Sequence, residues 1–303
     1  MITKADLPPV RGRIMERAQM AAFTWFRVGG PADIIFMPAD NDDLAAFLKA
    51  TPRNIPVMPV GVGSNLLVRD GGVRGVVVRL GKPFAEVDVD WINIHAGAAA
   101  LDLSVAKAAQ AAGLMGLEFY SGVPGTIGGA LTMNAGAYGR ETCDVMIEAT
   151  GYDRDGNFHH FTNEEMDFSY RHCGLADKFS SEGGFIFTGA IFRGAVDDPD
   201  AVAARMDEIR TRRESSQPIR ERTGGSTFAN PPGHKSWQLI DSIGGRGRIV
   251  GDAQVSEQHC NFLINKGNAT AADLEQLGES VRNDVRRMHD IDLRWEIRRV
   301  GEA

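Results

Sequence analysis

Residues 59–68 read Pro-Val-Gly-Val-Gly-Ser-Asn-Leu-Leu-Val, the pattern of a strand that ends in a glycine turn and then returns to the core. Glycine lacks a Cβ atom, reaches positive φ and lets backbone N–H groups approach a ligand closely. A concave run of N–H donors with small side chains suits a diphosphate. The turn is neither the dinucleotide fingerprint nor a P-loop, because the third glycine and the Gly-Lys-Ser/Thr run are both missing. We therefore predict a diphosphate-binding turn, with an ordinary tight turn as the open alternative.

A second glycine-rich segment spans residues 116–139. It has too few large side chains to fill a core, so we expect irregular backbone close to something flat or charged. Apolar residues nevertheless recur along it, at Leu117, Phe119, Val123, Ile127 and Met133. They favour a segment tucked into the protein over a flexible surface loop.

The composition is that of a globular protein in a reducing compartment. The chain has 303 residues, of which 43% are hydrophobic. Its net charge of -7 argues against general nucleic-acid binding. Cys143, Cys173 and Cys260 suggest neither a disulfide framework nor a metal site, and the histidines do not cluster. We find no signal peptide and no membrane span, and expect a cytosolic protein without metal.

The pattern of elements predicts an α+β architecture. Periodicity and turn residues predict helices and strands in alternation. The expected helices cover residues 13–20, 40–50, 101–112, 198–213, 236–242 and 270–288. The expected strands cover residues 33–37, 57–61, 75–80, 91–96, 145–152, 158–161, 185–193, 261–265 and 292–300.

Several separate motifs, in order, carry a family resemblance. They are residues 24–32 (Thr-Trp-Phe-Arg-Val-Gly-Gly-Pro-Ala), 61–67, 123–130, 133–139, 224–231 and 293–301. Over residues 24–301 the chain resembles the UDP-N-acetylenolpyruvoylglucosamine reductases, flavoenzymes of bacterial peptidoglycan synthesis. The resemblance implies a two-lobed FAD-binding module of the vanillyl-alcohol-oxidase (PCMH) type and a C-terminal α+β substrate-binding domain. We expect boundaries at 1–75, 76–195 and 196–303, and a monomer.

The resemblance also implies FAD, bound non-covalently, with NADPH as co-substrate. The flavin diphosphate is expected on the first glycine turn and the isoalloxazine ring on the second segment. The implied cofactor-binding residues are Gly61, Val62, Gly63, Ser64, Asn65, Leu66, Pro124, Gly125, Thr126, Gly128, Gly129, Asn134 and Gly136.

Arg171 is the first candidate for catalysis. Phe168 and Tyr170 share one face of a strand-like run, so Ser169 and Arg171 point to the other. Alone, such an arginine is usually a surface residue. In the family, an arginine in a Ser-Tyr-Arg context binds the substrate carboxylate, which a guanidinium matches bidentately, and Arg171 and Tyr170 fit that context.

Ser226 follows two glycines that are expected to expose it in a tight turn, and a plain Gly-Ser loop is the alternative. In the family the matching serine protonates a carbanion, and Asn230 matches a substrate-binding asparagine. The family pattern has lysine where this chain has Ala229, so a phosphate contact from that position is in doubt. Arg222 or Lys235 is our hypothesis for its replacement.

Glu296 lies in the last expected strand, where Leu293, Trp295 and Ile297 face one way and Glu296 faces the other. A surface salt-bridge ladder is the ordinary interpretation. The family has a catalytic glutamate near its C-terminus, commonly after proline, and here Trp295 occupies the proline position.

The reaction that the resemblance implies is reduction of an enolpyruvyl ether on a UDP-sugar, with UDP-N-acetylmuramate as product. No tyrosine lies between Arg171 and Ser226, so we expect the shorter family type without a tyrosine lid. A flavin oxidase of the same superfamily remains an alternative. So does a nucleotide-binding protein without catalysis.

Overall fold

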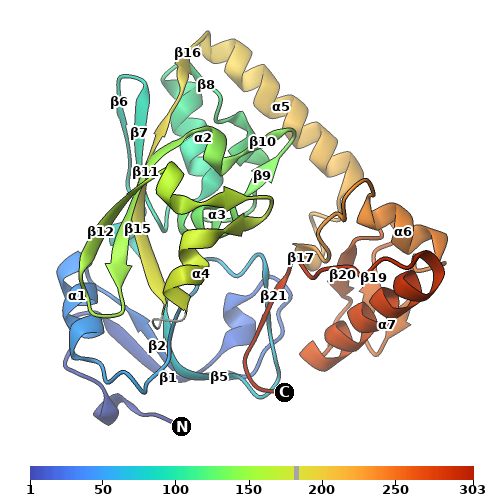
Figure 1. The fold of residues 1–303 in the computed structure, drawn as a ribbon, viewed down its shortest axis with the longest axis horizontal. Coiled ribbons are helices and arrows are strands. Elements are labelled where there is room, and N and C mark those ends of the chain that lie inside the picture. Colours follow the sequence, from blue (N-terminus) through green and yellow to red (C-terminus); the bar gives the residue numbers. More distant parts are fainter. Residues whose placement is uncertain (181–183) are drawn as a thin grey trace. The chain divides into compact units, whose positions relative to one another are not determined.

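The computed structural model describes residues 1–180 and 184–303, which form two compact units (Figure 1). Unit 1 comprises Met1–Glu16, Ile34–Gly61 and Gly75–Arg212, and unit 2 comprises Arg17–Asp33, Val62–Arg74 and Arg213–Ala303. The chain passes between the units several times, within strands β1, β2 and β5 and within helix α5. Each unit is therefore assembled from three separate stretches of sequence.

Unit 1 contains two sheets. The four-stranded sheet, mostly of unit 1 residues, has the order β1 (Arg13–Gln19), β2 (Pro31–Met37), β5 (Val73–Val78) and β3 (Val57–Pro59). The five-stranded sheet has the order β12 (Phe158–Thr162), β11 (Met146–Asp153), β15 (Phe185–Arg193), β7 (Asn93–Gly97) and β6 (Val87–Asp90). Three short antiparallel pairs complete it: β9 (Gly136–Ala137) with β10 (Arg140–Glu141), β13 (Phe168–Ser169) with β14 (His172–Cys173), and β8 (Leu114–Met115) with β16 (Ala195–Val196).

The helices of unit 1 pack on these sheets and enclose two hydrophobic cores. They are α1 (Asn41–Ala50), α2 (Asp102–Ala111), α3 (Ile127–Met133), α4 (Gly174–Ser180) and α5 (Pro199–Ser216), of which the last residues lie in unit 2. One core gathers α2, α3 and the five-stranded sheet around Tyr120 and Phe192. The other packs α1 through Leu44 and Phe47 onto the four-stranded sheet.

A buried arginine closes the C-terminus of α1. Arg154 lies in the turn after β11 and is 4% exposed. Its guanidinium donates to four main-chain carbonyls: Leu48 (2.8 Å), Thr51 (3.3 Å), Pro52 (2.9 Å) and Ile55 (3.2 Å). Because the last carbonyls of a helix have no partner within it, this one side chain supplies donors to the end of α1 and to the loop that follows, where the Pro52 carbonyl also accepts from the Ile55 amide at 3.0 Å.

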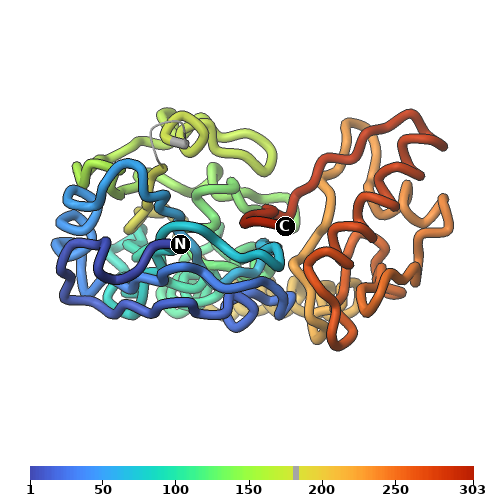
Figure 2. The backbone as a smooth tube through the Cα atoms, turned by 90° about the horizontal axis from the view of Figure 1, so that it is seen from below, coloured from blue at the N-terminus to red at the C-terminus, as the bar shows by residue number. Residues whose placement is uncertain are grey.

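Unit 2 is a four-stranded sheet with two helices. The order is β17 (Arg222–Ser226), β20 (Phe262–Asn265), β19 (Ala253–Val255) and β18 (Ile249–Val250), and the helices are α6 (Ser236–Ser242) and α7 (Ala271–His289). A parallel pair joins β4 (Leu66–Val68) to β21 (Arg298–Val300), with Leu66 opposite Arg298. After α7 the chain runs on as an extended stretch toward the C-terminus (Figure 2). The core of unit 2 combines Phe26 and Leu67 with the apolar face of α7.

Many of the expected elements are confirmed. The strand over Phe185–Arg193 and the helix over Ser236–Ser242 have the predicted bounds. Asp40 caps α1 by accepting from the Asp43 amide at 2.9 Å. Thr270 and Asp273 form the predicted capping box of α7.

Three of the expected elements are wrong, and one strand was missed. Residues 13–19 form strand β1 instead of a helix, and β6 was not expected. The glycine-rich segment contains helix α3 where irregular backbone was predicted. Of the expected final strand, only Arg298–Val300 is regular, because the preceding residues bond to a loop instead of a sheet.

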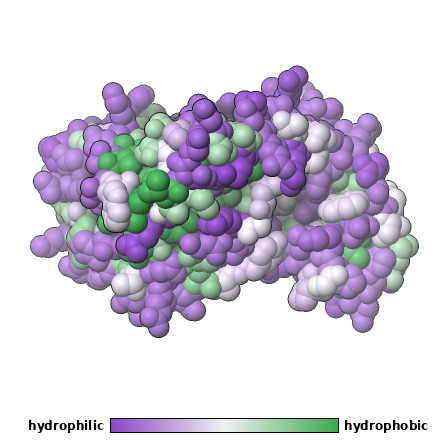
Figure 3. Space-filling model, turned by 90° about the horizontal axis from the view of Figure 1, so that it is seen from above, coloured by the Kyte–Doolittle hydropathy of each residue, from purple (hydrophilic) through white to green (hydrophobic). Residues whose placement is uncertain are grey.

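The helices of the described residues fall short of the requirements of a membrane span. None of the helices in the described ranges combines the length and the apolar character that a span requires. Figure 3 shows a face on which hydrophilic residues predominate and one hydrophobic patch stands out.

Candidate active site

In unit 1 the first glycine turn meets the second glycine-rich segment. A Cβ atom on Gly61 would lie 2.6 Å from Oγ1 of Thr126, so only glycine fits there. The second glycine-rich segment is fixed to residues 98–100 by backbone hydrogen bonds: the amides of Ile127 and Gly128 donate to the carbonyls of Ala100 (3.0 Å) and Ala98 (2.8 Å). A Cβ atom on Gly129, in contrast, would meet nothing closer than 3.9 Å. The first turn of α3 thus leaves open space at Gly129, where a flat ring could approach the backbone.

A buried carboxyl lies behind this loop. Asp102 is the first residue of α2, and its amide donates to the Gly125 carbonyl at 3.2 Å. The side chain is fully buried, and neither of its oxygens has a hydrogen-bond partner within the described residues. Burial raises the pKa of the Asp102 carboxyl well above its usual range, and the nearby Gly125 amide offsets this only in part. Asp102 was not among the predicted site residues, although the sequence has an aspartate at the start of an apolar helix.

Arg171 is placed by a turn and not by a strand. Strand β13 ends at Ser169, and Arg171 has a φ of 55°, so the predicted alternation of faces does not extend to it. Its guanidinium donates to Oε1 of Glu141 at 3.1 Å and to the Gly136 carbonyl at 2.8 Å. It also lies over the half-exposed ring of Tyr170, 4.9 Å from the ring centre. The carboxylate of Glu141 is thus a neighbour of Arg171 that the sequence analysis missed.

Asn134 ties the same cluster together. It caps α3 in the left-handed conformation and is buried. Its amide nitrogen donates to Glu141 (2.9 Å) and to the Ser169 carbonyl (3.1 Å), while its oxygen accepts from the Cys143 amide (2.9 Å). Asn134 therefore orients Glu141, and through it the guanidinium of Arg171.

In unit 2 the turn over Val62–Leu66 presents several backbone donors. Gly63 has a φ of 68°, and a Cβ atom there would lie 2.2 Å from the Phe23 carbonyl oxygen, so the turn requires glycine. Within residues 1–180 and 184–303, the amides of Val62, Gly63 and Ser64 donate to no backbone carbonyl. Such a row of amides is suited to an anionic group. The residues present therefore fit a flavin diphosphate.

Ser226 and Glu296 lie on two segments of unit 2 that are bonded to each other. Ser226 ends β17, where the ladder with β20 is interrupted, so a β-bulge positions it instead of the expected tight turn. The next carbonyl, of Thr227, accepts from the Glu296 amide at 2.8 Å. On the other side of Glu296, its own carbonyl accepts from the Asn65 side chain at 3.0 Å. The backbone of Glu296 is thus fixed between the serine loop and the first glycine turn.

The predicted substrate-binding residues of unit 2 lie at the start of β17 and in the segment between Ser226 and α6. Arg222 donates to the Gly267 carbonyl at 3.0 Å, and Asn230 accepts from the Ser236 amide at 3.0 Å. Lys235 is exposed at the start of α6. Ala229 is buried, with its amide bonded to the Arg294 carbonyl at 2.9 Å. Arg171 and Tyr170 belong to unit 1, whereas Ser226 and Glu296 belong to unit 2.

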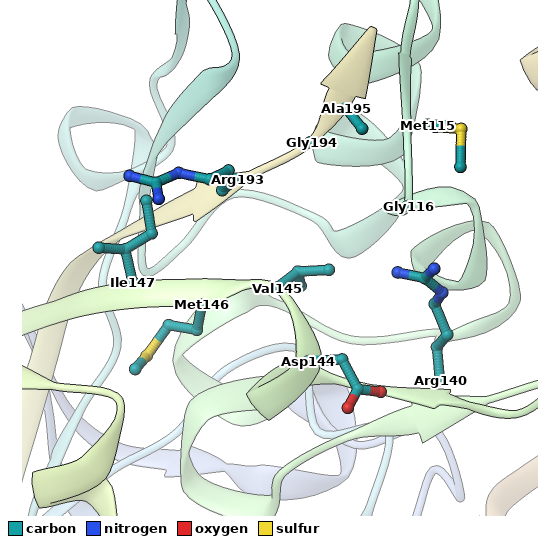
Figure 4. Close-up of a pocket in the computed structure, with 10 residues that line it drawn as sticks. All are labelled: Met115, Gly116, Arg140, Asp144, Val145, Met146, Ile147, Arg193, Gly194 and Ala195. Atoms are coloured by element: carbon teal, nitrogen blue, oxygen red, sulfur yellow. The ribbon is translucent and has the colours of Figure 1, made fainter. Parts of the chain in front are cut away.

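A separate cavity of about 330 Å³ opens in unit 1. Figure 4 shows Arg140 reaching toward Gly116 above Asp144, with Arg193 on the other side. None of the predicted site residues lines this cavity. In the part of the chain that the structure describes, no group of His, Cys, Asp and Glu side chains is placed to hold a metal ion.

Two family models match the chain. The model described as an FAD binding domain matches residues 32–162, and the C-terminal domain model of UDP-N-acetylenolpyruvoylglucosamine reductase matches residues 217–300. In fold the chain also resembles 6-hydroxy-D-nicotine oxidase from Arthrobacter nicotinovorans, with a TM-score of 0.54 at 12% identity over 92% of this chain and 86% of that one. The chain is an FAD-dependent oxidoreductase with an α+β fold of the vanillyl-alcohol-oxidase (PCMH) type.

Near-full-length relatives identify the family. The reductases of Parvibaculum lavamentivorans (57% identity, 97% of this chain, 93% of the relative) and Phenylobacterium zucineum (58%, 99% and 99%) both carry the name UDP-N-acetylenolpyruvoylglucosamine reductase. The crystal structure of the Thermus caldophilus enzyme of that name matches with a TM-score of 0.83 at 32% identity, over 96% of this chain and 100% of that one. The chain belongs to the UDP-N-acetylenolpyruvoylglucosamine reductase family.

Proposed function

We propose that this protein uses NADPH to reduce the enolpyruvyl group of UDP-N-acetylglucosamine enolpyruvate, giving UDP-N-acetylmuramate for peptidoglycan precursors. The observation that carries the proposal is the bond between the Glu296 amide and the Thr227 carbonyl, 2.8 Å long. It places a carboxyl and an alcohol, distant in sequence, on adjoining backbone segments. The family to which the chain belongs supports the choice of substrate.

Ser226 is proposed as the proton donor. When bound, FAD supplies hydride transfer: it accepts a hydride from NADPH and passes one to the β-carbon of the enol ether. Negative charge then develops beside the substrate carboxylate, and Oγ of Ser226 donates a proton to the α-carbon. General acid catalysis of this kind contributes about 10²–10⁴-fold.

Arg171 and Glu296 are proposed to stabilise the charge that develops. The guanidinium of Arg171 is already oriented by Glu141 and by the Gly136 carbonyl, so little reorganisation is needed when a substrate carboxylate binds. Tyr170, Arg222, Asn230 and Lys235 are proposed substrate contacts. Lys235 is exposed and cationic, and therefore suited to the UDP phosphates.

FAD is proposed to bind along the two glycine segments. The amides of Val62, Gly63 and Ser64 fit its diphosphate, with Gly61, Asn65 and Leu66 shaping the turn. Pro124, Gly125, Thr126, Gly128 and Gly129, which lead into helix α3 and form its start, are proposed to lie against the ring, and the open space beside Gly129 supports this. Asn134 and Gly136 complete the proposed cofactor-binding set. They also contact the residues around Arg171, Asn134 through Glu141 and Gly136 through its carbonyl.

Anaerobic half-reactions test the proposal. NADPH should bleach the flavin absorbance, and the enolpyruvyl sugar nucleotide should restore it. A flavin oxidase would instead be reoxidised rapidly by oxygen, and a binding protein would do neither. If NADPH leaves the flavin oxidised, the reductase proposal is wrong.

The Ser226→Ala variant separates the two steps. Reduction by NADPH is expected to survive, while reoxidation by the sugar nucleotide falls by about 10²–10⁴-fold. Equal loss of both half-reactions would remove Ser226 from the acid role and indicate a damaged fold instead.

A further inference from the structure

The residue before Glu296 occupies a site built for it on α7. Gly278 faces the indole of Trp295 so closely that a Cβ atom there would lie 2.2 Å from Cη2 and 2.4 Å from Cζ2. The indole Nε1 donates to Oε1 of Glu279 at 2.8 Å. On its other side the ring contacts Phe228, with 5.0 Å between ring centres. Shape and hydrogen bonding together fix the indole.

Ionic contacts hold this site rigid. The guanidinium of Arg299 lies 4.4 Å from the centre of the Trp295 ring and donates to Glu275 (3.0 Å) and Glu279 (2.8 Å). Arg69, just after β4, forms a two-bonded pair with Glu275 at 3.0 and 2.7 Å. This pairing holds the pKa of the Glu275 carboxyl below its usual range.

The backbone on both sides of the indole contacts the loop that follows Ser226. Trp295 and Phe228 form a β-bridge, and the Ala229 amide donates to the Arg294 carbonyl. The Glu296 amide donates to Thr227. A movement of the indole is therefore passed on to Glu296 and to the serine loop at once.

We infer that Trp295 is a positioning residue, seated in the notch at Gly278, that sets the placement of Glu296 relative to Ser226. This inference rests on the proposed function for the roles of Glu296 and Ser226. The indole itself need not touch substrate. Its contribution is made through the backbone of its neighbour.

The sharpest test is a double-mutant cycle of Gly278→Ala and Trp295→Leu. The added methyl group displaces the indole, and a displacement of about 1 Å at a reacting group costs about 10²-fold in rate. We expect Gly278→Ala to slow reoxidation of the flavin by the enolpyruvyl sugar nucleotide, with reduction by NADPH and the Kd for FAD unchanged. In the Trp295→Leu background the alanine should cost nothing further, because the clashing ring atoms are gone.

Conservative variants keep the test decisive if alanine at 278 prevents folding. Trp295→Phe keeps an aromatic ring but loses the Nε1 donor, and Glu279→Gln keeps an acceptor but removes the charge. Both should slow reoxidation by the sugar nucleotide, less than Gly278→Ala does, and spare reduction by NADPH. Trp237→Phe is the matched control, since Trp237 is an exposed tryptophan of the same unit.

The outcomes are distinguishable. Failure of the unmodified protein to pass through both half-reactions would contradict the proposed function before any variant is compared. If the unmodified protein completes both half-reactions, two results in folded variants would overturn the positioning role of Trp295. One is an equal loss of rate in both half-reactions, and the other is no loss of rate in either.

Discussion

Replacing Arg154 by methionine should weaken unit 1 without touching the proposed site. The variant keeps an apolar stem of similar length and removes the guanidinium that four carbonyls share. The residues whose carbonyls lose a donor lie at the end of α1 and in the loop that follows it. We therefore expect α1 to loosen at its C-terminus.

The size of the effect follows from the contacts. The two shorter bonds, to Leu48 and Pro52, lie within the ordinary range for strong hydrogen bonds, and each bond to a charged donor contributes about 1.5–3 kcal/mol. Burial opposes this gain, and it lowers the pKa of the Arg154 guanidinium below its usual range. We expect a net loss of about 3 kcal/mol in the free energy of unfolding, which for a unit of this size lowers Tm by about 6–12 °C.

Thermal and urea unfolding followed by circular dichroism would measure this loss. The matched control is Arg53→Met, since Arg53 is an exposed arginine of the same unit, paired with Asp155 at the surface. Exposed pairs contribute about 0–1 kcal/mol, so the control should melt close to the unmodified protein. Equal melting of both variants would refute the reasoning that the buried guanidinium stabilises α1.

Two further predictions concern residues beside the proposed site. Asp102 keeps its proton in the folded state at pH values where the unfolded chain, with a pKa of about 3.9, has lost it. Its contribution to stability is therefore greatest below that pH and falls as pH rises. Asp102→Asn should remove this fall, so urea titrations should show the variant gaining stability relative to the unmodified protein as the pH rises above 4. A stability difference that stays constant with pH would contradict this prediction. Glu141→Gln should keep the hydrogen bond to Arg171 but remove the charge that pairs with the guanidinium. In steady-state kinetics, the KM for the sugar nucleotide should therefore change while the KM for NADPH does not. Equal changes in the two KM values would argue against the proposed role of Arg171.

The sequence was sufficient where local signals and tertiary structure agree. Helix α7 has both a capping box and a continuous apolar face, and its capping box at Thr270 and Asp273 was predicted correctly. Strand β15 is buried along most of its length and was predicted with its full bounds. The family motifs led to the FAD-binding fold that the comparisons then showed.

Tertiary pairing explains the errors. Residues 13–19 are rich in helix-forming side chains, but pairing with β2 makes them the edge strand of a sheet. Strand β6 carries a Val-Asp-Val-Asp alternation that was available and overlooked. Glu141 lies 30 residues from Arg171 in the sequence, and no local sequence pattern predicts such a contact.

The pairing of β21 with β4 also sets the order of steps in folding during translation. The strand after the first glycine turn has Arg298–Val300 as its parallel neighbour, and the Arg69 amide donates to the Val300 carbonyl at 2.9 Å. While the ribosome is still adding residues, that neighbour does not yet exist outside the exit tunnel. The strand that follows the turn can therefore acquire this parallel neighbour only after residue 300 has been synthesised and has left the tunnel.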